Sequence, residues 1–330
     1  MSQSLTELDA KIVEALLIDG RASWQRIAHT LGVNERTVAR RGNELLDSGD
    51  VWVGAIKVPM PGFVVALRCG QGQSRMTSTA LSQHHASSWV HVTAGDYDVV
   101  AEINIPNDNE SNFLLEELPA FAGVREINSY PVVEYLRQAR IWNLGILTEQ
   151  ERRAMWEAAP NSRHNYVGTE DPLSARDAAL LTALRSDGRL PYEELGRRAG
   201  VSDVTAKRRV DALRRNGTIA IRTFFNPKAL GLTTEALMWL EVPPRHIPEV
   251  VEGVRRAEHI KYAARLTGPW AFMLMTNIPG RMALDDVLPD EPWVEHISRY
   301  NVSIALRTDK LSTVRTQPDS VPSPTAAGSR

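Results

Sequence analysis

The sequence predicts an α+β protein in which a helical unit and a β-rich segment each occur twice. The main observation is an internal repeat without gaps, because Asp177 and Gly217 follow their counterparts Asp9 and Gly49 by the same 168 residues. Within each copy, apolar residues recur at helical spacing in three short segments. Each copy then continues into strand-like segments that alternate with two further helices. We therefore expect one supersecondary unit to have been duplicated.

The bulk composition allows several domains and excludes some classes of protein. A chain of 330 residues can bury more than one core, and no apolar run approaches the roughly 18 residues that a membrane span needs. The first residues lack the basic start and apolar stretch of a secretory signal. A single cysteine, Cys69, excludes an intrachain disulfide framework and a multi-cysteine zinc site, so we expect a cytoplasmic protein. The net charge of −2 means that any affinity for nucleic acid must come from local patches.

The repeated unit is a helix-turn-helix by its apolar spacing and its caps. Helices are expected over residues 6–18, 24–31 and 35–47 of the first copy. The segment Asp19-Gly20-Arg21 ends the first of these helices. In Gly32-Val33-Asn34 the glycine supplies a permissive backbone, the valine fills the angle between two helices, and the asparagine caps the third. The second copy repeats each step.

Gly42 interrupts this correspondence, because the second copy has Val210 at the same place. A glycine in the middle of a helix costs about 1 kcal/mol relative to alanine. We call each helix-turn-helix copy a head. Either the first head is less stable than the second, or its third helix packs unusually close to a neighbour.

A β-rich segment follows each head. In the first half, strands are expected near residues 51–58, 62–68, 88–94, 98–105 and 125–135, and helices near 74–84 and 109–119. In the second half, strands are expected near residues 218–225, 235–242, 259–267, 270–276 and 295–306, and helices near 246–256 and 280–288. The βαββαβ order predicts an antiparallel, ferredoxin-like sheet with two helices on one face. The expected first half comprises a winged-helix-like helix-turn-helix domain over 1–53 and a sheet domain over 54–139, followed by a linker over 140–172. The expected second half comprises another winged-helix-like helix-turn-helix domain over 173–221, a sheet domain over 222–316 and a disordered tail over 317–330.

The heads resemble the Lrp/AsnC (feast/famine) family of bacterial and archaeal transcriptional regulators. The resemblance rests on Leu8-Asp9-Ala10, Asp19-Gly20-Arg21, Ile27-Ala28, Leu31-Gly32-Val33 and the run from Thr37 to Arg41. It implies a helix-turn-helix that precedes a βαββαβ ligand-sensing domain, usually in a dimer. The tandem arrangement resembles an entire dimer written as one chain, so we expect an intrachain pseudo-dimer or a homo-oligomer.

The third helix of each head carries the candidate DNA-binding residues. In a helix-turn-helix, the first residues of this helix reach base edges while their neighbours fix the register on phosphates. Basic residues on an outer helix face can equally serve only to solvate it, but their recurrence at the same offset favours a functional role. The candidates are Asn34, Arg36, Thr37, Arg40 and Arg41 in the first head, and Ser202, Thr205, Lys207, Arg208 and Arg209 in the second.

The two reading faces differ. Asn34-Glu35-Arg36 corresponds to Ser202-Asp203-Val204, and Ala39 corresponds to Lys207. A symmetric dimer reads a palindrome. We therefore expect this chain to prefer an asymmetric site or to tolerate degenerate half-sites.

The resemblance also implies a small effector, commonly an amino acid, bound where sensing domains meet. The matching loop is Gly95-Asp96-Tyr97-Asp98, in which either carboxylate could hold an ammonium group. A polar turn that merely caps a β-hairpin would have the same composition. The second half has Gly268-Pro269-Trp270 instead and lacks the carboxylate, so we expect one functional and one degenerate pocket.

These observations predict a sequence-specific DNA-binding transcriptional regulator that is not an enzyme. Its expected partners are double-stranded DNA and a small effector, and it needs no cofactor. His84, His85 and His91 lack the companions that a metal site needs. Two alternatives stay open: an enzyme of the siroheme decarboxylase kind, which resembles the same architecture, and an amino-acid-sensing or oligomerisation module that does not bind DNA.

Overall fold

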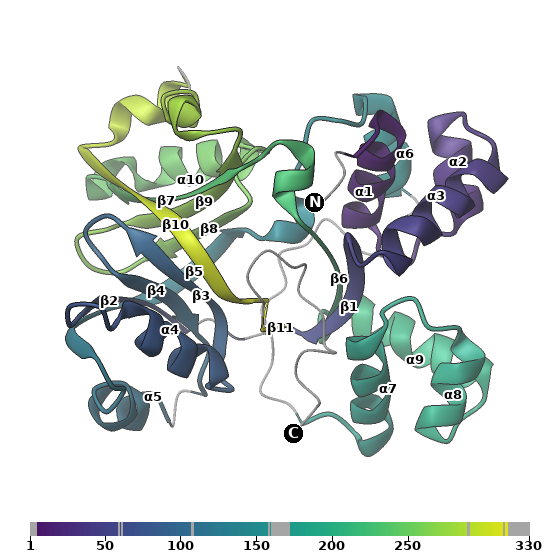
Figure 1. Cartoon of the computed structure of the whole chain (residues 1–330), viewed down its shortest axis with the longest axis horizontal. Coiled ribbons are helices and arrows are strands. Elements are labelled where there is room, and N and C mark those ends of the chain that lie inside the picture. Colours follow the sequence, from purple (N-terminus) through teal and green to yellow (C-terminus); the bar gives the residue numbers. More distant parts are fainter. Residues whose placement is uncertain are drawn as a thin grey trace. The chain divides into compact units, whose positions relative to one another are not determined.

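A computed structural model describes residues 5–58, 60, 62–106, 109–157, 159, 172–288, 291–312 and 314–315. The chain divides into two units (Figure 1). The helical unit contains the chain up to Val58 and the segment Asn143–Leu230, and the sheet unit contains Pro59–Trp142 and Gly231–Pro318. The expected disordered tail over 317–330 and most of the second half of the expected linker lie outside the described residues.

The helical unit contains the two predicted heads. The first comprises α1 (Glu7–Ile18), α2 (Trp24–Leu31) and α3 (Glu35–Asp47), and the second comprises α7 (Ala175–Ser186), α8 (Tyr192–Ala199) and α9 (Asp203–Arg215). Thr6 and Ser174 cap the first helix of each head by accepting a hydrogen bond from the backbone three residues on. Gly32 and Gly200 end the second helices with φ of 64° and 66°, a left-handed conformation that favours glycine.

A two-stranded ribbon joins the heads. Strand β1 (Val51–Lys57) pairs antiparallel with β6 (Ile219–Phe225), and Gly54 lies opposite Arg222 at the centre of the ribbon. These two residues are counterparts in the repeat. The other pairs map onto one another: the pair of Val51 with Phe225, for example, corresponds to the pair of Ile219 with Lys57. The ribbon therefore has pseudo-twofold symmetry, as an isologous contact between identical subunits would have.

Close packing explains Gly42. A Cβ atom at this position would lie 2.5 Å from the Trp24 ring, so the indole of α2 occupies the space that a side chain on α3 would need. At the corresponding places the second head has Tyr192 and Val210, a smaller ring and a larger helix residue. Of the two explanations that the sequence allowed, the close approach is confirmed.

The segment expected as a linker contains a helix, α6 (Glu149–Glu157). The buried carboxylate of Glu14 on α1 accepts hydrogen bonds from the backbone of Leu144, Ile146 and Leu147, at 2.8–3.2 Å. Lys11 adds an ion pair to Glu151 at 2.9 Å. The beginning of this segment is therefore part of the first head.

The sheet unit contains the two βαββαβ halves. The first half has β2 (Phe63–Cys69), α4 (Ser74–Gln83), β3 (Ser87–Ala94), β4 (Val99–Ile103), α5 (Glu110–Asn112) with a π-helical turn over Phe113–Glu117, and β5 (Val124–Arg137). The second half has β7 (Thr234–Glu241), α10 (Ile247–Arg256), β8 (Tyr262–Leu266), β9 (Phe272–Ile278), β10 (Arg299–Leu311) and β11 (Val314–Arg315). The helix expected near 280–288 is only a short 3₁₀ turn over Arg281–Leu284.

All strands of both halves belong to one nine-stranded sheet in the order β11-β10-β3-β4-β2-β5-β8-β9-β7, which closes because β10 also pairs with β7. The long strand β5 pairs with β2 of its own half up to Pro131, and with β8 of the other half from Val132 onward. Strand β10 does the same with β7 and β3. The expectation of two separate sheets is therefore corrected, because β5 and β10 each extend into the other half (Figure 1).

Alternating side chains assign the two faces of this sheet. On β2, Val65 and Leu67 pack with the helices of the first half, whereas Val64 and Ala66 face a central core shared by both halves. That shared core is rich in aromatic and sulfur-containing side chains, among them Trp239 of β7. No helix among the described residues has the length and apolar character needed to cross a membrane.

Candidate nucleic-acid interface

The repeated Asp-Gly-Arg motif docks the two heads on each other. The Arg21 guanidinium donates to the backbone carbonyls of Gly188 and Leu190 in the second head, at 2.5 and 2.9 Å. It also lies over the Tyr192 ring, 4.5 Å from the centroid. One side chain of the first head thus makes two hydrogen bonds and a ring contact to the second.

Arg189, the counterpart of Arg21, makes the reciprocal contacts. Its guanidinium donates to the carbonyls of Gly20 and Ala22, at 2.7 and 3.0 Å, and lies 4.2 Å from the centroid of the Trp24 ring. Burial and the nearby charge of Arg21 lower the pKa of Arg189 to about 10, so the group stays charged at neutral pH. We call this pair of arginines and their carbonyl acceptors the reciprocal clasp.

The glycines of the motif allow the heads to approach the ribbon. A Cβ atom at Gly20 would lie 2.8 Å from Cγ1 of Val53, and one at Gly188 would lie 2.9 Å from the same atom. The Gly188 amide also donates to the Val53 carbonyl at 2.7 Å. Both glycines of the motif therefore allow their heads to lie close to the ribbon.

The acidic residue of the motif has different environments in the two heads. Asp19 is 4% exposed and pairs with Arg26 at 2.7 Å and with Arg214 of the second head at 2.9 Å. Burial alone would raise the pKa of Asp19, but the charges of Arg214 and Arg26 outweigh it and lower that pKa. Its counterpart Asp187 is exposed. The interface between the heads therefore has one ion triad around the buried Asp19, in addition to the symmetric clasp.

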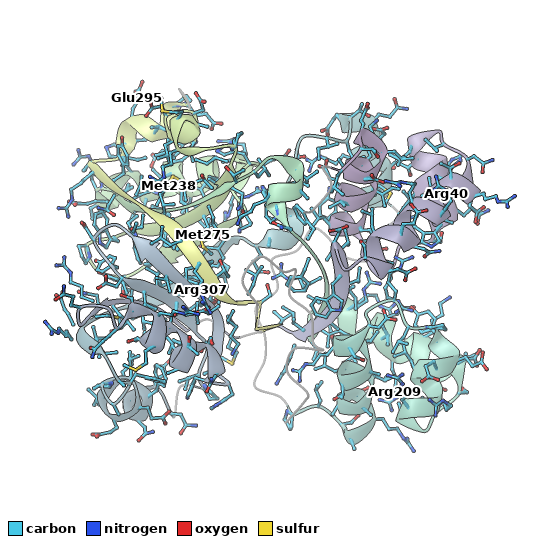
Figure 2. All side chains as sticks on the ribbon, viewed as in Figure 1. Arg40, Arg209, Met238, Met275, Glu295 and Arg307 are labelled. Carbon is cyan, nitrogen blue, oxygen red and sulfur yellow. The ribbon has the colours of Figure 1, made fainter. Side chains whose placement is uncertain are left out.

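Helices α3 and α9 place several predicted DNA-binding residues on the exposed side of each head. Arg36, Lys207 and Arg208 are exposed, and none forms an ion pair with another residue that the structure describes. Arg40 pairs with Glu44 at 2.6 Å, but both side chains are largely exposed and such a pair contributes little. These four cations (Arg40 is labelled in Figure 2) are accessible to an anionic partner.

Asn34 and Ser202 cap the two recognition helices. The Asn34 side chain accepts from the Arg36 amide at 2.9 Å, and Ser202 accepts from the Thr205 amide at 3.2 Å. Thr37 and Thr205 are only half-buried, so their hydroxyl groups lie at the edge of the exposed face.

Arg41 and Arg209 have intramolecular partners, in contrast to their predicted role. The guanidinium of Arg41 binds the buried carboxylate of Asp9 on α1 at 2.5 and 2.8 Å, and also Glu44. Arg209 (Figure 2) binds Asp177 on α7 at 2.9 Å. Each arginine holds the first and third helices of its head together, and its contact with DNA stays a prediction. Both pairs span two helices, a separation that sequence spacing does not reveal.

The predicted effector loop lies in the sheet unit between β3 and β4, and three of its residues make contacts within the fold. The Asp98 carboxylate accepts from the Cys69 amide at 2.7 Å, and the Asp96 carboxylate accepts from the side chain of Asn301 at 2.8 Å. The Tyr97 hydroxyl is hydrogen-bonded to that of Tyr130 at 2.9 Å. Gly95 has φ of 153°. These contacts are those of a turn that orders a hairpin, so binding of an effector here stays a prediction.

The sequence reading missed a buried carboxyl in the shared core. Glu102 on β4 is 3% exposed and accepts hydrogen bonds from the Tyr135 hydroxyl and, at 3.2 Å, from the Asn104 side chain. Burial raises the pKa of Glu102, and these hydrogen bonds offset only part of that effect. One signal was available: Glu102 interrupts the otherwise apolar strand from Val99 to Ile103.

Glu102 makes the stability of the chain depend on pH. Because its folded-state pKa is raised, the folded chain is most stable below the unfolded pKa and loses stability as the pH rises through the raised value. We expect Glu102→Gln to remove this dependence, so that the melting temperature of the variant rises relative to that of the wild type as the pH increases above 4.5. Thermal unfolding at several pH values measures the difference. Glu116→Gln, at an exposed position, is the control, and parallel curves for wild type and Glu102→Gln would contradict the expectation.

Comparison with protein families decides what the heads are. The model of the AsnC-type helix-turn-helix domain matches residues 5–46 and again residues 173–214. The chain contains two helix-turn-helix domains of the AsnC type. This confirms the resemblance stated from the sequence, and the two matches coincide with the two heads of the structure.

Several relatives of the same type cover one half of the chain. The HTH-type transcriptional regulator FL11 of Pyrococcus abyssi is 26% identical over 140 residues, which are 41% of this chain and 93% of the regulator. The HTH-type transcriptional regulator Ptr1 of Methanocaldococcus jannaschii is 25% identical over 136 residues, again 41% of this chain and 92% of its own length.

A likeness to a solved structure extends over nearly the whole tandem chain. The siroheme decarboxylase NirDL has a TM-score of 0.59 at 14% identity and covers 93% of both chains. At this identity the likeness concerns the fold alone. It confirms an α+β architecture of helix-turn-helix heads with ferredoxin-like domains.

Proposed function

We propose that this Lrp/AsnC-type chain is a sequence-specific DNA-binding transcriptional regulator whose two heads bind the two half-sites of one operator. The observation that carries the proposal is the reciprocal clasp, in which Arg21 and Arg189 relate the heads by a pseudo-twofold axis. Helix-turn-helix dimers use such symmetry to place two recognition helices in successive major grooves. Relatives that match one half of the chain are named as transcriptional regulators, which supports the same function.

The recognition helices supply the chemistry. Arg36 and Arg208 can pair bidentately with guanine or bind phosphates, and Lys207 adds a charge on the second head. Each Arg or Lys that neutralises a phosphate releases counterions, so binding should weaken steeply with salt although the net charge of the chain is only −2. One chain, as an intrachain pseudo-dimer, would then be the DNA-binding unit, in the cytoplasm.

Arg208→Ala is the first test. We expect weaker binding to the operator, and a salt dependence shallower by about one unit of slope if Arg208 contacts a phosphate. A titration of the duplex at two or more salt concentrations measures both. Arg185→Ala removes a charge from an exposed position on α7 of the same head and is the matched control. Equal losses in both variants would contradict a specific role for Arg208.

We further propose that a small effector such as an amino acid acts on the sheet unit through the loop that contains Asp96 and Asp98. The support is the family resemblance of this loop, together with two carboxylates beside Gly95. An effector can shift the chain between two arrangements only by its difference in affinity for them. Calorimetric titration with individual amino acids, on wild type and Asp96→Asn, tests binding at this loop.

The fold of NirDL keeps an enzymatic function as the second candidate. A tetrapyrrole carboxylate substrate requires a cleft with His or Arg groups, and of the eight histidines of this chain only His91 and His259 are separated by the 168 residues of the repeat. Incubation with an iron-containing tetrapyrrole distinguishes the candidates. We expect no change in Soret absorbance, and a stoichiometric spectral change would favour the enzyme.

A further inference from the structure

The two recognition helices occupy equivalent places but present opposite chemistry at one position. Helices α3 and α9 have the same length of 13 residues and are capped at corresponding residues. The clasp and the ribbon relate the two heads symmetrically. Arg36 in the first turn of α3 therefore has Val204 as its counterpart in the first turn of α9.

Val204 has no structural reason to be apolar. Its relative exposure is 72%, and within the described part of the helical unit it is the one large hydrophobic residue that is mostly exposed. Valine is a poorer helix former than arginine or alanine, so helix propensity does not favour it either. Nearby on the same helix, Lys207 and Arg208 are exposed cations. An apolar group beside two accessible cations fits a partner that has both phosphates and an apolar feature at its surface.

We propose that Val204 is a specificity-determining residue that contacts the methyl group of a thymine, whereas Arg36 pairs with a guanine at the mirror position. This inference rests on the proposed function and adds the base preference of each head. In the major groove, thymine is the base with a methyl group, and apolar side chains contact it, while arginine prefers the O6 and N7 acceptors of guanine.

The operator then has an imperfect twofold axis. The half-site of the first head carries a G·C pair where the half-site of the second head carries a T·A pair. The two half-sites then differ in the base pair that Arg36 and Val204 contact. Their spacing needs no such asymmetry, because the clasp is symmetric. A perfect palindrome of either half-site satisfies only one head at this position.

Removing one methyl group tests the contact directly. Deoxyuridine in place of the thymine keeps every hydrogen bond and deletes the methyl, and we expect it to weaken binding by the wild-type chain about fourfold, the value of one buried methylene. Val204→Ala should weaken binding to the thymine duplex by a similar factor and should be insensitive to deoxyuridine. Because Val204 is exposed, this variant is expected to fold as the wild type does.

A second experiment exchanges the base preference of each head by substitution. Val204→Arg should shift the selected operator toward guanine in both half-sites, and Arg36→Val should shift it toward thymine in both. Two results would overturn the inference and leave the regulator function standing. In the first, the wild type binds its operator selectively, but deoxyuridine in either half-site does not change the affinity. In the second, deoxyuridine weakens binding by the wild type and by Val204→Ala equally. Absence of any sequence preference in the wild type would instead overturn the regulator function itself and the inference with it.

Discussion

Replacing Asp19 by alanine is expected to lower the free energy of unfolding by about 3 kcal/mol, because the substitution leaves two partly buried guanidinium groups without their shared, buried carboxylate. Arg26 and Arg214 both bind this side chain, and the side chain of Arg214 is only 12% exposed. Urea unfolding of the full chain, followed by circular dichroism, measures the loss. The effect concerns the docking of the heads because Arg214 belongs to the second head and Asp19 to the first.

The repeat supplies the control. Asp187→Ala removes the same side chain at the corresponding, exposed position, where it accepts one hydrogen bond from the Arg189 amide. We expect a loss of about 1 kcal/mol there. Comparable losses at the two positions would contradict the account of the triad around Asp19.

The triad also predicts behaviour in acid. Since the folded-state pKa of Asp19 is lowered, its contribution is complete above the unfolded value near 3.8 and is lost as the pH falls through the lower folded value. Asp19→Ala should therefore flatten the acid side of the stability profile of the wild type.

The double substitution of Arg21 and Arg189 by alanine is expected to weaken binding to an operator with two half-sites strongly. Two linked heads bind an operator about 10²–10⁴ times more tightly than one head binds a half-site, provided that the linkage lets both heads bind at once. Because the β1–β6 ribbon still joins the heads, we expect a loss of about tenfold to a hundredfold on an operator with two half-sites. Binding to a single half-site should change little, since Arg21 and Arg189 face the other head and not the exposed side of α3 or α9.

Spacing distinguishes a lost clasp from a lost charge. Insertion of about 5 base pairs, half a helical turn, between the half-sites should impair the wild type strongly and the double variant much less. Lysine at both positions keeps the charges but not the two-pronged hydrogen bonding, so it should behave as the alanine variant does. Retention of wild-type spacing dependence in both double variants would contradict the clasp.

Local patterns predicted the heads well because each head is stabilised by contacts close in sequence. The turn at Gly32 and Gly200, the caps and the apolar positions follow from spacing alone. The repeated Asp-Gly-Arg motif was visible but its role was not, because the carbonyl acceptors of Arg21 lie 167 and 169 residues further along the chain.

The same reason explains the errors. The helix-joining contacts of Arg41 and Arg209 were not predicted because their acidic partners lie 32 residues away, on another helix. The strand periodicity of β5 and β10 indicated their existence but not that each pairs with both halves. Glu102 was overlooked because its hydroxyl donor, Tyr135, comes from a different strand of the closed sheet.

Selection of genomic fragments by the purified full-length chain tests the central claim most directly. Fragments bound at moderate salt would be sequenced and compared with fragments bound by the Arg36→Ala/Arg208→Ala double variant. The account predicts a shared motif of two related half-sites about one helical turn or a multiple of it apart, enriched by the wild type and lost in the variant. Recovery of fragments without a common motif, at the same level for both proteins, would contradict it.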